Sequence, residues 1–310
     1  MAVDDSGLAL LELGRALRAR GYAFTTVTPD THARVLARVT GSGTSAVRPA
    51  NDLRDVFGWS RPFRAELLPA EWLDCLRRAD ALSYEGELLR SRVRFSSLNG
   101  ALYVHSAFPT RSGDAVFFGP DTHRFCAWLR RCVTHARCVV DVGCGTGAGG
   151  LDLAGRVERI VLADINPRAL AFAQVNAALA SVHAELIVSD VLRSVTHDFD
   201  LVVANPPYML DAEARLYRDG GGAHGEALAV RIVDEALERL RPGGKLVLYT
   251  GSAIVNGHDT VQAALAPRLQ QRRARWTYEE LDPDVFGEEL DRPGYAEVER
   301  IAAVGLCVTI

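Results

Sequence analysis

The sequence predicts an α/β fold in which a mostly parallel β-sheet is covered by helices on both faces, with a small helical domain in front of it. One observation is a series of short, continuously apolar segments from residue 138 onward, each the length of a buried strand. Another is that segments with helical periodicity separate these runs, an alternation typical of parallel sheets. A third is that the chain before residue 92 has helical patterns instead.

The N-terminal part of the chain has apolar side chains at helical spacing. Leu10, Leu13 and Leu17 fall on one stripe of a helix, and the segments 31–39 and 69–81 have the same character. Pro69 and Glu71 are typical of a helix start, because proline is tolerated in the first turn and an acidic side chain is favourable there. We therefore expect a helical domain over residues 1–91.

A different pattern begins at residue 92, where short apolar runs alternate with turns. The runs 93–95 and 102–104 flank the pair Asn99-Gly100, which is a strong signal for a two-residue hairpin turn. We expect residues 92–118 to form a connecting β-hairpin region and residues 119–310 to form the catalytic domain.

The C-terminal part supplies the strands and helices of the predicted sheet. The apolar runs are 138–142, 160–163, 186–188, 201–204 and 246–249. Helical stretches such as 167–180 and 227–240 lie between them. Because strands with continuous apolar character are buried on both faces, this alternation predicts helices on each side of the sheet.

Composition excludes several classes of protein. The chain has 310 residues, of which 48% are hydrophobic and 24% charged, and its net charge of −4 without a basic tail disfavours general adhesion to nucleic acid or membranes. It has no apolar run near the about 18 residues of a membrane span, and Asp4 and Asp5 stand where a signal peptide needs positive charge. Six cysteines without a CxxC pair and scattered histidines predict reduced thiols and no metal site. We expect a soluble, cytoplasmic protein.

A glycine-rich segment follows the first predicted strand. Asp141 precedes Gly143, Gly145 and Gly147, and glycines here let the backbone turn sharply and approach a ligand. Asp164 follows 21 residues after Gly143, at the end of the second strand, where a carboxylate can accept hydrogen bonds from both ribose hydroxyls. The spacing also satisfies the dinucleotide pattern, so these residues alone predict a nucleoside cofactor without separating NAD from others.

The fourth strand ends in the tetrad Asn205-Pro206-Pro207-Tyr208. Two prolines stop the strand and fix a rigid, extended backbone whose carbonyls have few local donors. A planar amide or aromatic amine is a poor nucleophile, so a catalyst must hold its NH2 group. The Asn205 side-chain oxygen and the Pro206 carbonyl can accept the two N–H bonds, and Tyr208 offers a flat face to the planar group. The tetrad therefore predicts a catalytic site that holds the NH2 group of a planar amide or aromatic amine as the nucleophile.

The cofactor loops resemble those of class I S-adenosylmethionine-dependent methyltransferases. The resemblance rests on the glycine segment after Asp141, on Asp164 and on Ser189-Asp190-Val191 after the third strand. It implies a Rossmann-like, mostly parallel seven-stranded sheet and S-adenosylmethionine as cofactor. Gly143 and Gly145 would pass under the methionine moiety, with Gly147 completing the loop, and Asp141 would orient the loop or meet the cofactor's ammonium. Asp164 with Ile165 would hold the ribose, and Asp190 with Val191 the adenine, with Asn205 also close to the cofactor.

The order of domains and the tetrad resemble those of the protein N5-glutamine methyltransferases that modify peptide-chain release factors. Residues 119–122 stand where that family has Pro-Arg-Pro-[Asp/Glu]-Thr, which implies that Thr122 touches the cofactor. Phe118, Gly119 and His123 depart from the family pattern. The resemblance covers residues 92–310 and implies substrate recognition by the N-terminal domain. The acidic residues Glu288, Glu289 and Asp291 have no assigned role.

These observations predict an N-methyltransferase whose acceptor is a glutamine-bearing loop of a protein. Two alternatives stay open, because the tetrad occurs in amino-methyltransferases of several kinds. One is a nucleic-acid enzyme acting on adenine N6 or guanine N2 after base flipping, and the other is a small-molecule N-methyltransferase. A non-catalytic nucleoside-binding regulator would not need Asn205 and Tyr208.

Overall fold

Within residues 3–39, 48–110, 112–211 and 213–310, which the computed structural model describes, the central sheet has seven strands along its hydrogen-bonded path. In spatial order they are β11 (Arg275–Asp282), β12 (Val298–Thr309), β9 (Lys245–Val255), β8 (Leu201–Ala204), β5 (Ala136–Val142), β6 (Val157–Asp164) and β7 (Glu185–Val188). The five strands from β9 to β7 are parallel, whereas β12 and β11 are antiparallel to their neighbours. A short β10 (His258–Asp259) pairs with β9. This arrangement confirms the predicted fold class.

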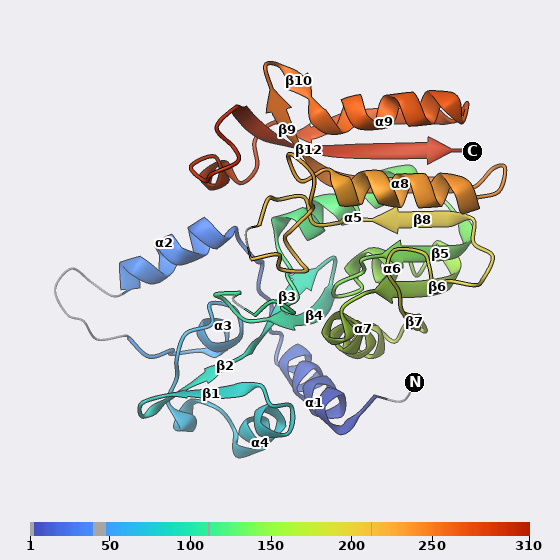
Figure 1. The fold of residues 1–310 in the computed structure, drawn as a ribbon. Helices are drawn as coiled ribbons and strands as arrows, with labels where there is room; N and C mark the ends of the chain where they lie inside the picture. The colour runs from blue at the N-terminus through green and yellow to red at the C-terminus, as the bar shows by residue number, and fades with distance from the viewer. Residues whose placement is uncertain (1–2, 40–47, 111, 212) are drawn as a thin grey trace.

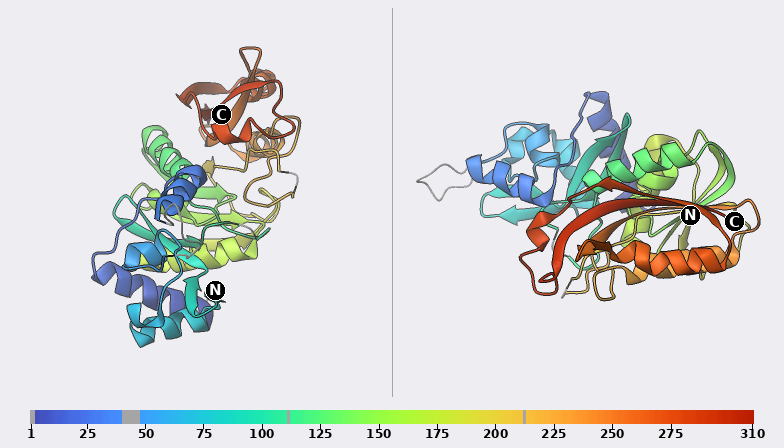
Figure 2. Two further views of the ribbon diagram at one scale, coloured as in Figure 1. Left: turned by 90° about the vertical axis from the view of Figure 1, so that its left-hand side faces the viewer. Right: turned by 90° about the horizontal axis from the view of Figure 1, so that it is seen from above.

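Helices cover both faces of the sheet (Figures 1 and 2). One face carries α5 (Pro120–Cys132), α6 (Ala148–Asp152) and α7 (Pro167–Ala180), and the other α8 (Ala227–Arg239) and α9 (Thr260–Gln271). Side chains alternate between faces along each strand. Val139 on β5 packs into the first core and the next residue, Val140, into the second. The continuous apolar runs in the sequence are the consequence of these two cores.

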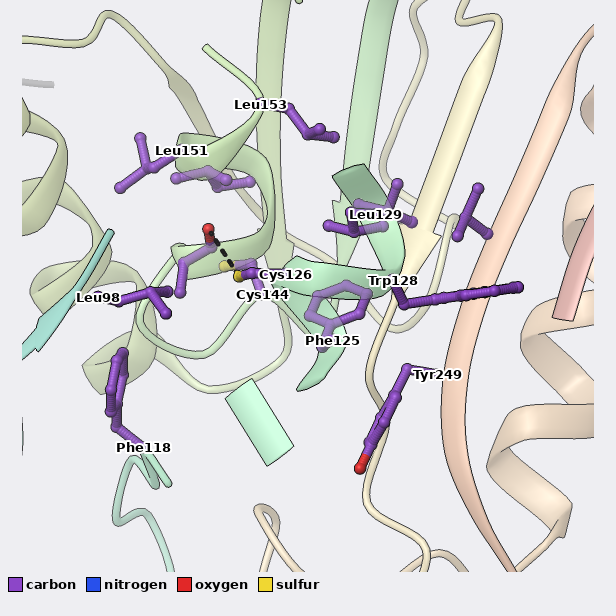
Figure 3. Close-up of a cluster of buried hydrophobic side chains, with 14 of the residues drawn as sticks. Leu98, Phe118, Phe125, Cys126, Trp128, Leu129, Cys144, Leu151, Leu153 and Tyr249 are labelled. Carbon is purple, nitrogen blue, oxygen red and sulfur yellow. Dashed lines mark hydrogen bonds between the residues drawn. The ribbon is translucent and has the colours of Figure 1, made fainter. Parts of the chain in front are cut away.

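The core under α5 consists of large side chains from helix and sheet (Figure 3). Phe125, Trp128 and Leu129 of α5 are buried there with Tyr249 of β9. The ring centroids of Phe125 and Tyr249 lie 6.4 Å apart. The hydroxyl of Tyr249 points away from Trp128 in Figure 3, toward the end of the sheet where α5 begins.

The N-terminal part consists of short helices and two hairpins. The helices are α1 (Asp5–Ala19), α2 (Pro29–Val39), α3 (Leu53–Phe57), the 3-10 turn Ala65–Leu67 and α4 (Ala70–Arg78). The hairpin of β3 (Val93–Leu98) and β4 (Ala101–Ser106) turns at Asn99-Gly100, as the dipeptide predicts. A second hairpin, β1 (Leu82–Glu85) with β2 (Leu88–Ser91), lies inside the segment for which only helices were expected. Its turn uses Gly86, whose φ of 63° suits a residue without a Cβ.

The N-terminal part shares a core with the catalytic domain. Leu13 and Leu17 of α1 and Phe95 of β3 pack with Phe172 of α7. Helix α1 accordingly lies beside α7 (Figure 1). The buried side chain of Asn176 on α7 joins three parts of the chain: its Oδ1 accepts from the backbone N–H of Val104 (2.7 Å), and its Nδ2 donates to the carbonyls of Val104 (3.1 Å) and Thr146 (3.0 Å). One amide therefore fixes the β3–β4 hairpin against the glycine segment.

No helix among the described residues is both long and apolar enough to cross a membrane.

Candidate active site

A cavity of about 350 Å³ lies where the parallel strands β5, β6, β7 and β8 end. Because the carboxyl ends of parallel strands share one edge of a sheet, residues that follow them in the sequence meet there. The cavity wall contains these predicted residues: Thr122, Asp141, Gly143, Gly145, Asp164, Ile165, Asp190, Val191, Asn205, Pro206, Pro207 and Tyr208. Its volume lies in the range of small-molecule sites.

The glycine segment after β5 forms the floor of this cavity. Gly143 and Gly145 have φ values of 64° and 54°, in the left-handed region that L side chains rarely adopt. A Cβ built on Gly143 would meet no atom within 4 Å, so the space above it is open for a ligand. Gly147 has a different place: it caps α6, and a Cβ on it would lie 3.0 Å from Leu162 in the core. Gly147 is not in the cavity wall, contrary to its expected place at the cofactor, because it packs behind the loop.

Asp164, the last residue of β6, holds the loop with both carboxylate oxygens. Oδ2 accepts from the backbone N–H of Gly145 (2.8 Å) and Oδ1 from that of Asn166 (2.9 Å). Burial raises the pKa of Asp164, and these hydrogen bonds offset part of the rise. Each oxygen retains a lone pair for a hydroxyl donor in the cavity. Ile165, next in the chain, is 52% exposed at the mouth.

Asp141 on β5 is the most deeply buried carboxylate of the predicted site. It is 1% exposed, and its Oδ2 accepts from the backbone N–H of Gly150 (2.8 Å). Burial raises the pKa of Asp141 to about 7, and the charge of Asp164 adds to the rise, against the hydrogen bond from Gly150. A cationic group bound in the cavity would therefore stabilise the ionised form of this carboxylate.

Asp190 follows β7 and is held by an ion pair with α8. Its Oδ2 lies 2.7 Å from the guanidinium of Arg231 and 3.5 Å from that of Arg193. The hydrogen bond from Arg231 lowers the pKa of Asp190. The next residue, Val191, has a φ of 53°, and its carbonyl accepts from the hydroxyl of Ser189 (2.8 Å). The turn that presents Asp190 to the cavity is thus closed by its own neighbours.

The tetrad after β8 brings two acceptor groups and one ring into the cavity wall. Among the described residues, no hydrogen bond uses the side chain of Asn205 or the carbonyl of Pro206. Both acceptors are therefore available to a donor in the cavity. Gly220 and Gly225 pack against the tetrad from behind: a Cβ on Gly220 would lie 2.8 Å from the carbonyl oxygen of Pro207. The glycine run after the tetrad thus supports its backbone.

The Tyr208 ring is more enclosed than expected from the sequence, which predicted that it offers a flat face to the acceptor. It is 7% exposed, and a Cβ on Gly251 of β9 would lie 2.2 Å from its Cδ2, so the ring occupies a slot that only glycine leaves open. Its hydroxyl donates to Oδ2 of Asp121, and the hydroxyl of Tyr249 donates to Oδ1 of Asp121 (2.8 Å). Burial raises the pKa of Asp121, and the two tyrosine hydrogen bonds oppose this.

Asp121, Tyr249 and the arginines that line the cavity, Arg215, Arg218 and Arg292, were not predicted as site residues from the sequence. Asp121 stands beside Thr122, whose Oγ1 accepts from the backbone N–H of Gly119 at the start of α5 (3.3 Å). Asp121 lies within the segment 119–122, which the sequence had already placed near the cofactor, so its position in the chain could have indicated a site residue. Tyr249 offered none, because it is an ordinary apolar-run residue of β9.

Part of the unassigned acidic segment also lies at the cavity. Glu289 is 2% exposed and forms ion pairs with Arg218 and, at 3.0 Å, with Arg292. Arg218 lies 3.5 Å from Asp211, a residue of the segment after the tetrad. Arg218 and Arg292 line the cavity. The ion pairs of Glu289 therefore hold two arginines of the cavity wall, Arg218 and Arg292.

Known proteins resemble this chain in sequence and fold. Residues 126–271 match the family model "Methyltransferase small domain". The release factor glutamine methyltransferase of Deinococcus radiodurans is 33% identical over 224 residues, which are 68% of this chain and 78% of that protein. The corresponding protein of Koribacter versatilis is 32% identical over 164 residues, and the match spans 48% of this chain and 55% of that relative's length.

More distant similarities are to a ribosomal RNA methyltransferase in sequence and to a solved structure in fold. Ribosomal RNA small subunit methyltransferase C of Serratia proteamaculans is 32% identical over 110 residues, which are 35% of this chain and 29% of that protein. The solved structure of Trm5b from Pyrococcus abyssi has a TM-score of 0.51 at 15% identity and covers 74% of this chain and 62% of that one. At this identity the likeness concerns the fold alone.

The open floor above Gly143 and the carboxylates of Asp141 and Asp164 fit a nucleoside cofactor with a cationic amino-acid end. The match to the Deinococcus protein extends over more than two thirds of that relative at more than 30% identity. The chain therefore belongs to the release factor glutamine methyltransferase family, and it is a class I methyltransferase that uses S-adenosylmethionine.

Proposed function

We propose that this enzyme transfers the methyl group of S-adenosylmethionine to the side-chain amide nitrogen of a glutamine in a protein, with a peptide-chain release factor as the acceptor. The observation that carries the proposal is the tetrad 205–208 in the wall of the same cavity as the glycine loop. The names of the curated relatives point to the same acceptor. Because such an acceptor takes part in translation, we expect the enzyme to act in the cytoplasm.

The cofactor would lie along the glycine loop, held by side chains at successive strand ends. Asp141 would face its ammonium group, Asp164 with Ile165 its ribose, and Asp190 with Val191 its adenine, while Thr122 would close the site from α5. When bound, S-adenosylmethionine supplies an electrophilic methyl group on a sulfonium. The Arg231 ion pair keeps the Asp190 carboxylate ionised and therefore able to accept from an adenine amino group.

The tetrad would hold the acceptor amide in a reactive orientation. Asn205 Oδ1 and the Pro206 carbonyl accept its two N–H bonds, and this draws the nitrogen toward tetrahedral geometry. The Tyr208 ring flanks the planar group, and Pro207 keeps the backbone extended. No strong base is needed before attack, because the nitrogen loses its proton after methylation makes it cationic.

Three observations favour a protein acceptor over a nucleic acid. The net charge is −4. The arginines that line the cavity are held in ion pairs rather than free for phosphates: Arg218 and Arg292 pair with Glu289, and Arg215 pairs with Asp211. The ribosomal RNA relative matches over only 29% of its length. The experiment must therefore distinguish a protein acceptor from a nucleic-acid acceptor.

The test is to incubate the enzyme and methyl-labelled S-adenosylmethionine with a cell extract and to separate protein, RNA, DNA and metabolites. We expect the label in protein, on a glutamine side chain, and we expect Asn205→Ala to abolish most of it. Label in RNA or DNA, lost equally in Asn205→Ala, would replace the proposed acceptor with a base amino group. Label among metabolites would indicate a small-molecule enzyme.

A further inference from the structure

The buried carboxylate of Asp121 lies at the meeting point of the cavity, α5 and the sheet. It is the second residue of α5, is 6% exposed and belongs to the cavity wall. It receives two tyrosine hydroxyls, one from Tyr208 of the tetrad and one from Tyr249 of the sheet core. Its one close cation is Arg124 at 3.2 Å among the described residues, and that guanidinium also binds Asp282 at 2.7 Å.

Burial of a carboxylate is costly, and here its two oxygens are used to hold aromatic rings. We propose that Asp121 is a positioning residue of the methyl transfer, which acts by fixing the Tyr208 ring through its hydroxyl. The proposal rests on the proposed function of the tetrad as the holder of the acceptor NH2 group.

The Tyr208 ring is held at its base and at its tip. Its base is held because Pro206 and Pro207 restrict the backbone immediately before it. One side of the ring lies against Gly251, where no Cβ fits, and Phe286 meets it edge-on with ring centroids 6.2 Å apart. At the tip, Asp121 accepts the hydroxyl proton in a hydrogen bond. Without that bond, the polar tip of a buried ring has no partner among the described residues.

The ring's position matters for the reaction because it sets one wall of the acceptor site. The amide nitrogen must point at the methyl group while its N–H bonds reach Asn205 and Pro206. A displacement of about 1 Å in such an arrangement costs roughly 10²-fold in rate. Loss of the Asp121 bond should therefore lower kcat, whereas cofactor affinity should change little, because Asp121 does not belong to the glycine loop or to the carboxylates that follow β6 and β7.

Tyr249 provides a matched control. Its hydroxyl makes a bond of the same kind to the same carboxylate, but its ring lies in the core of the sheet and not in the cavity wall. Tyr249→Phe removes that bond and leaves Tyr208 in contact with Asp121. If Asp121 acts through Tyr208, Tyr249→Phe should lower kcat by less than about threefold, although it removes a hydrogen bond of the same kind to the same carboxylate.

The experiment is a double-mutant cycle with Asp121→Ala, Tyr208→Phe and both together. The acceptor is the one that the wild-type enzyme labels, and the readouts are kcat, KM and the Kd of S-adenosylhomocysteine. We expect each single variant to lose about 10- to 100-fold in kcat with Kd changed less than about twofold, and the double variant to lose no more than the worse single one. If the kcat losses of the two single variants instead multiply in the double variant, Asp121 does not act through Tyr208.

A conservative variant separates geometry from charge. In Asp121→Asn the amide NH2 can donate back to the Tyr208 hydroxyl while the amide oxygen accepts from Tyr249. We expect it to recover most of the activity lost in Asp121→Ala. Activity as low as in Asp121→Ala would overturn the proposal, because the negative charge would then be the needed property. If Asp121→Ala does not fold, the kcat of Tyr208→Phe alone tests the proposal. A wild-type kcat in Tyr208→Phe would contradict it.

Failure of the proposed function has a different signature. It would be seen with the wild-type enzyme, as label in RNA, DNA or metabolites. Failure of the positioning role would be seen only when the kcat values of the variants are compared, on whichever acceptor the wild-type enzyme methylates.

Discussion

We predict that the Asp141 carboxylate makes cofactor affinity depend on pH. Its side chain is 1% exposed in the cavity wall, and burial raises its pKa to about 7. The negative charge of Asp164 adds to this rise, and the N–H of Gly150 opposes it. In the proposed site Asp141 faces the ammonium of the cofactor, a cation that binds the ionised carboxylate better than the neutral acid.

The sign follows from the direction of the shift. Below about pH 7 the free enzyme holds a proton on Asp141, and ligand binding must expel it. Affinity is therefore highest above the pKa and falls as the pH drops through it. For a pKa of about 7, the ionised fraction predicts a Kd about 25-fold weaker at about pH 5.5 than at about pH 7.5, or about 1.9 kcal/mol.

Isothermal titration calorimetry with S-adenosylhomocysteine, which carries the same ammonium, measures this directly. Buffers with different ionisation enthalpies should reveal close to one proton released per ligand near pH 6. Asp141→Asn serves as the control, and its Kd should lose the slope between these pH values. A wild-type Kd that is constant over this range, or an unchanged slope in Asp141→Asn, would refute the reasoning.

Three further predictions concern the loop, the domain contact and the acceptor. Asp164→Ala should weaken S-adenosylhomocysteine binding by about 1.5–3 kcal/mol in calorimetry, because it removes a charged acceptor and leaves the N–H of Gly145 without its partner. An unchanged Kd would place Asp164 outside the ribose site. Asn176→Leu should lower the free energy of unfolding in urea by about 2–4 kcal/mol, since it leaves the buried N–H of Val104 without a partner, and wild-type stability would contradict this. With a protein acceptor, methylation should fall only gently between about 50 and 200 mM salt, whereas a loss of roughly 10³-fold in affinity would indicate phosphate contacts.

The parallel half of the sheet could be predicted because its strands are buried on both faces. That burial requires continuous apolar runs, as in 201–204, and such runs are visible in one sequence. Strand β11 escapes the same criterion, because it is an edge strand in which half-buried Trp276 and Tyr278 alternate with exposed charged or polar residues. The β1–β2 hairpin escapes it as well, since most of β1 is exposed or half-buried and its pattern carries little apolar signal.

The candidate site could be predicted where it is local in the chain. Gly143 and Asn205 each directly follow a strand and Asp164 is the last residue of one, so topology alone brings them together. The Asp121–Tyr208 hydrogen bond joins residues 87 positions apart, and the Arg218–Glu289 pair depends on how two loops fold over the cavity. Such contacts depend on loop packing rather than on strand order, so no pattern in the sequence indicates them.

The most direct test is tandem mass spectrometry of a peptide-chain release factor after reaction with the purified enzyme and S-adenosylmethionine. We predict one added methyl group on the side-chain amide nitrogen of a glutamine, and an initial rate about 10²-fold lower with Asn205→Ala while S-adenosylhomocysteine still binds. A methyl group on any other kind of acceptor, or an Asn205→Ala enzyme that is folded and as fast as the wild type, would contradict methyl transfer to an amide held by residues 205–208.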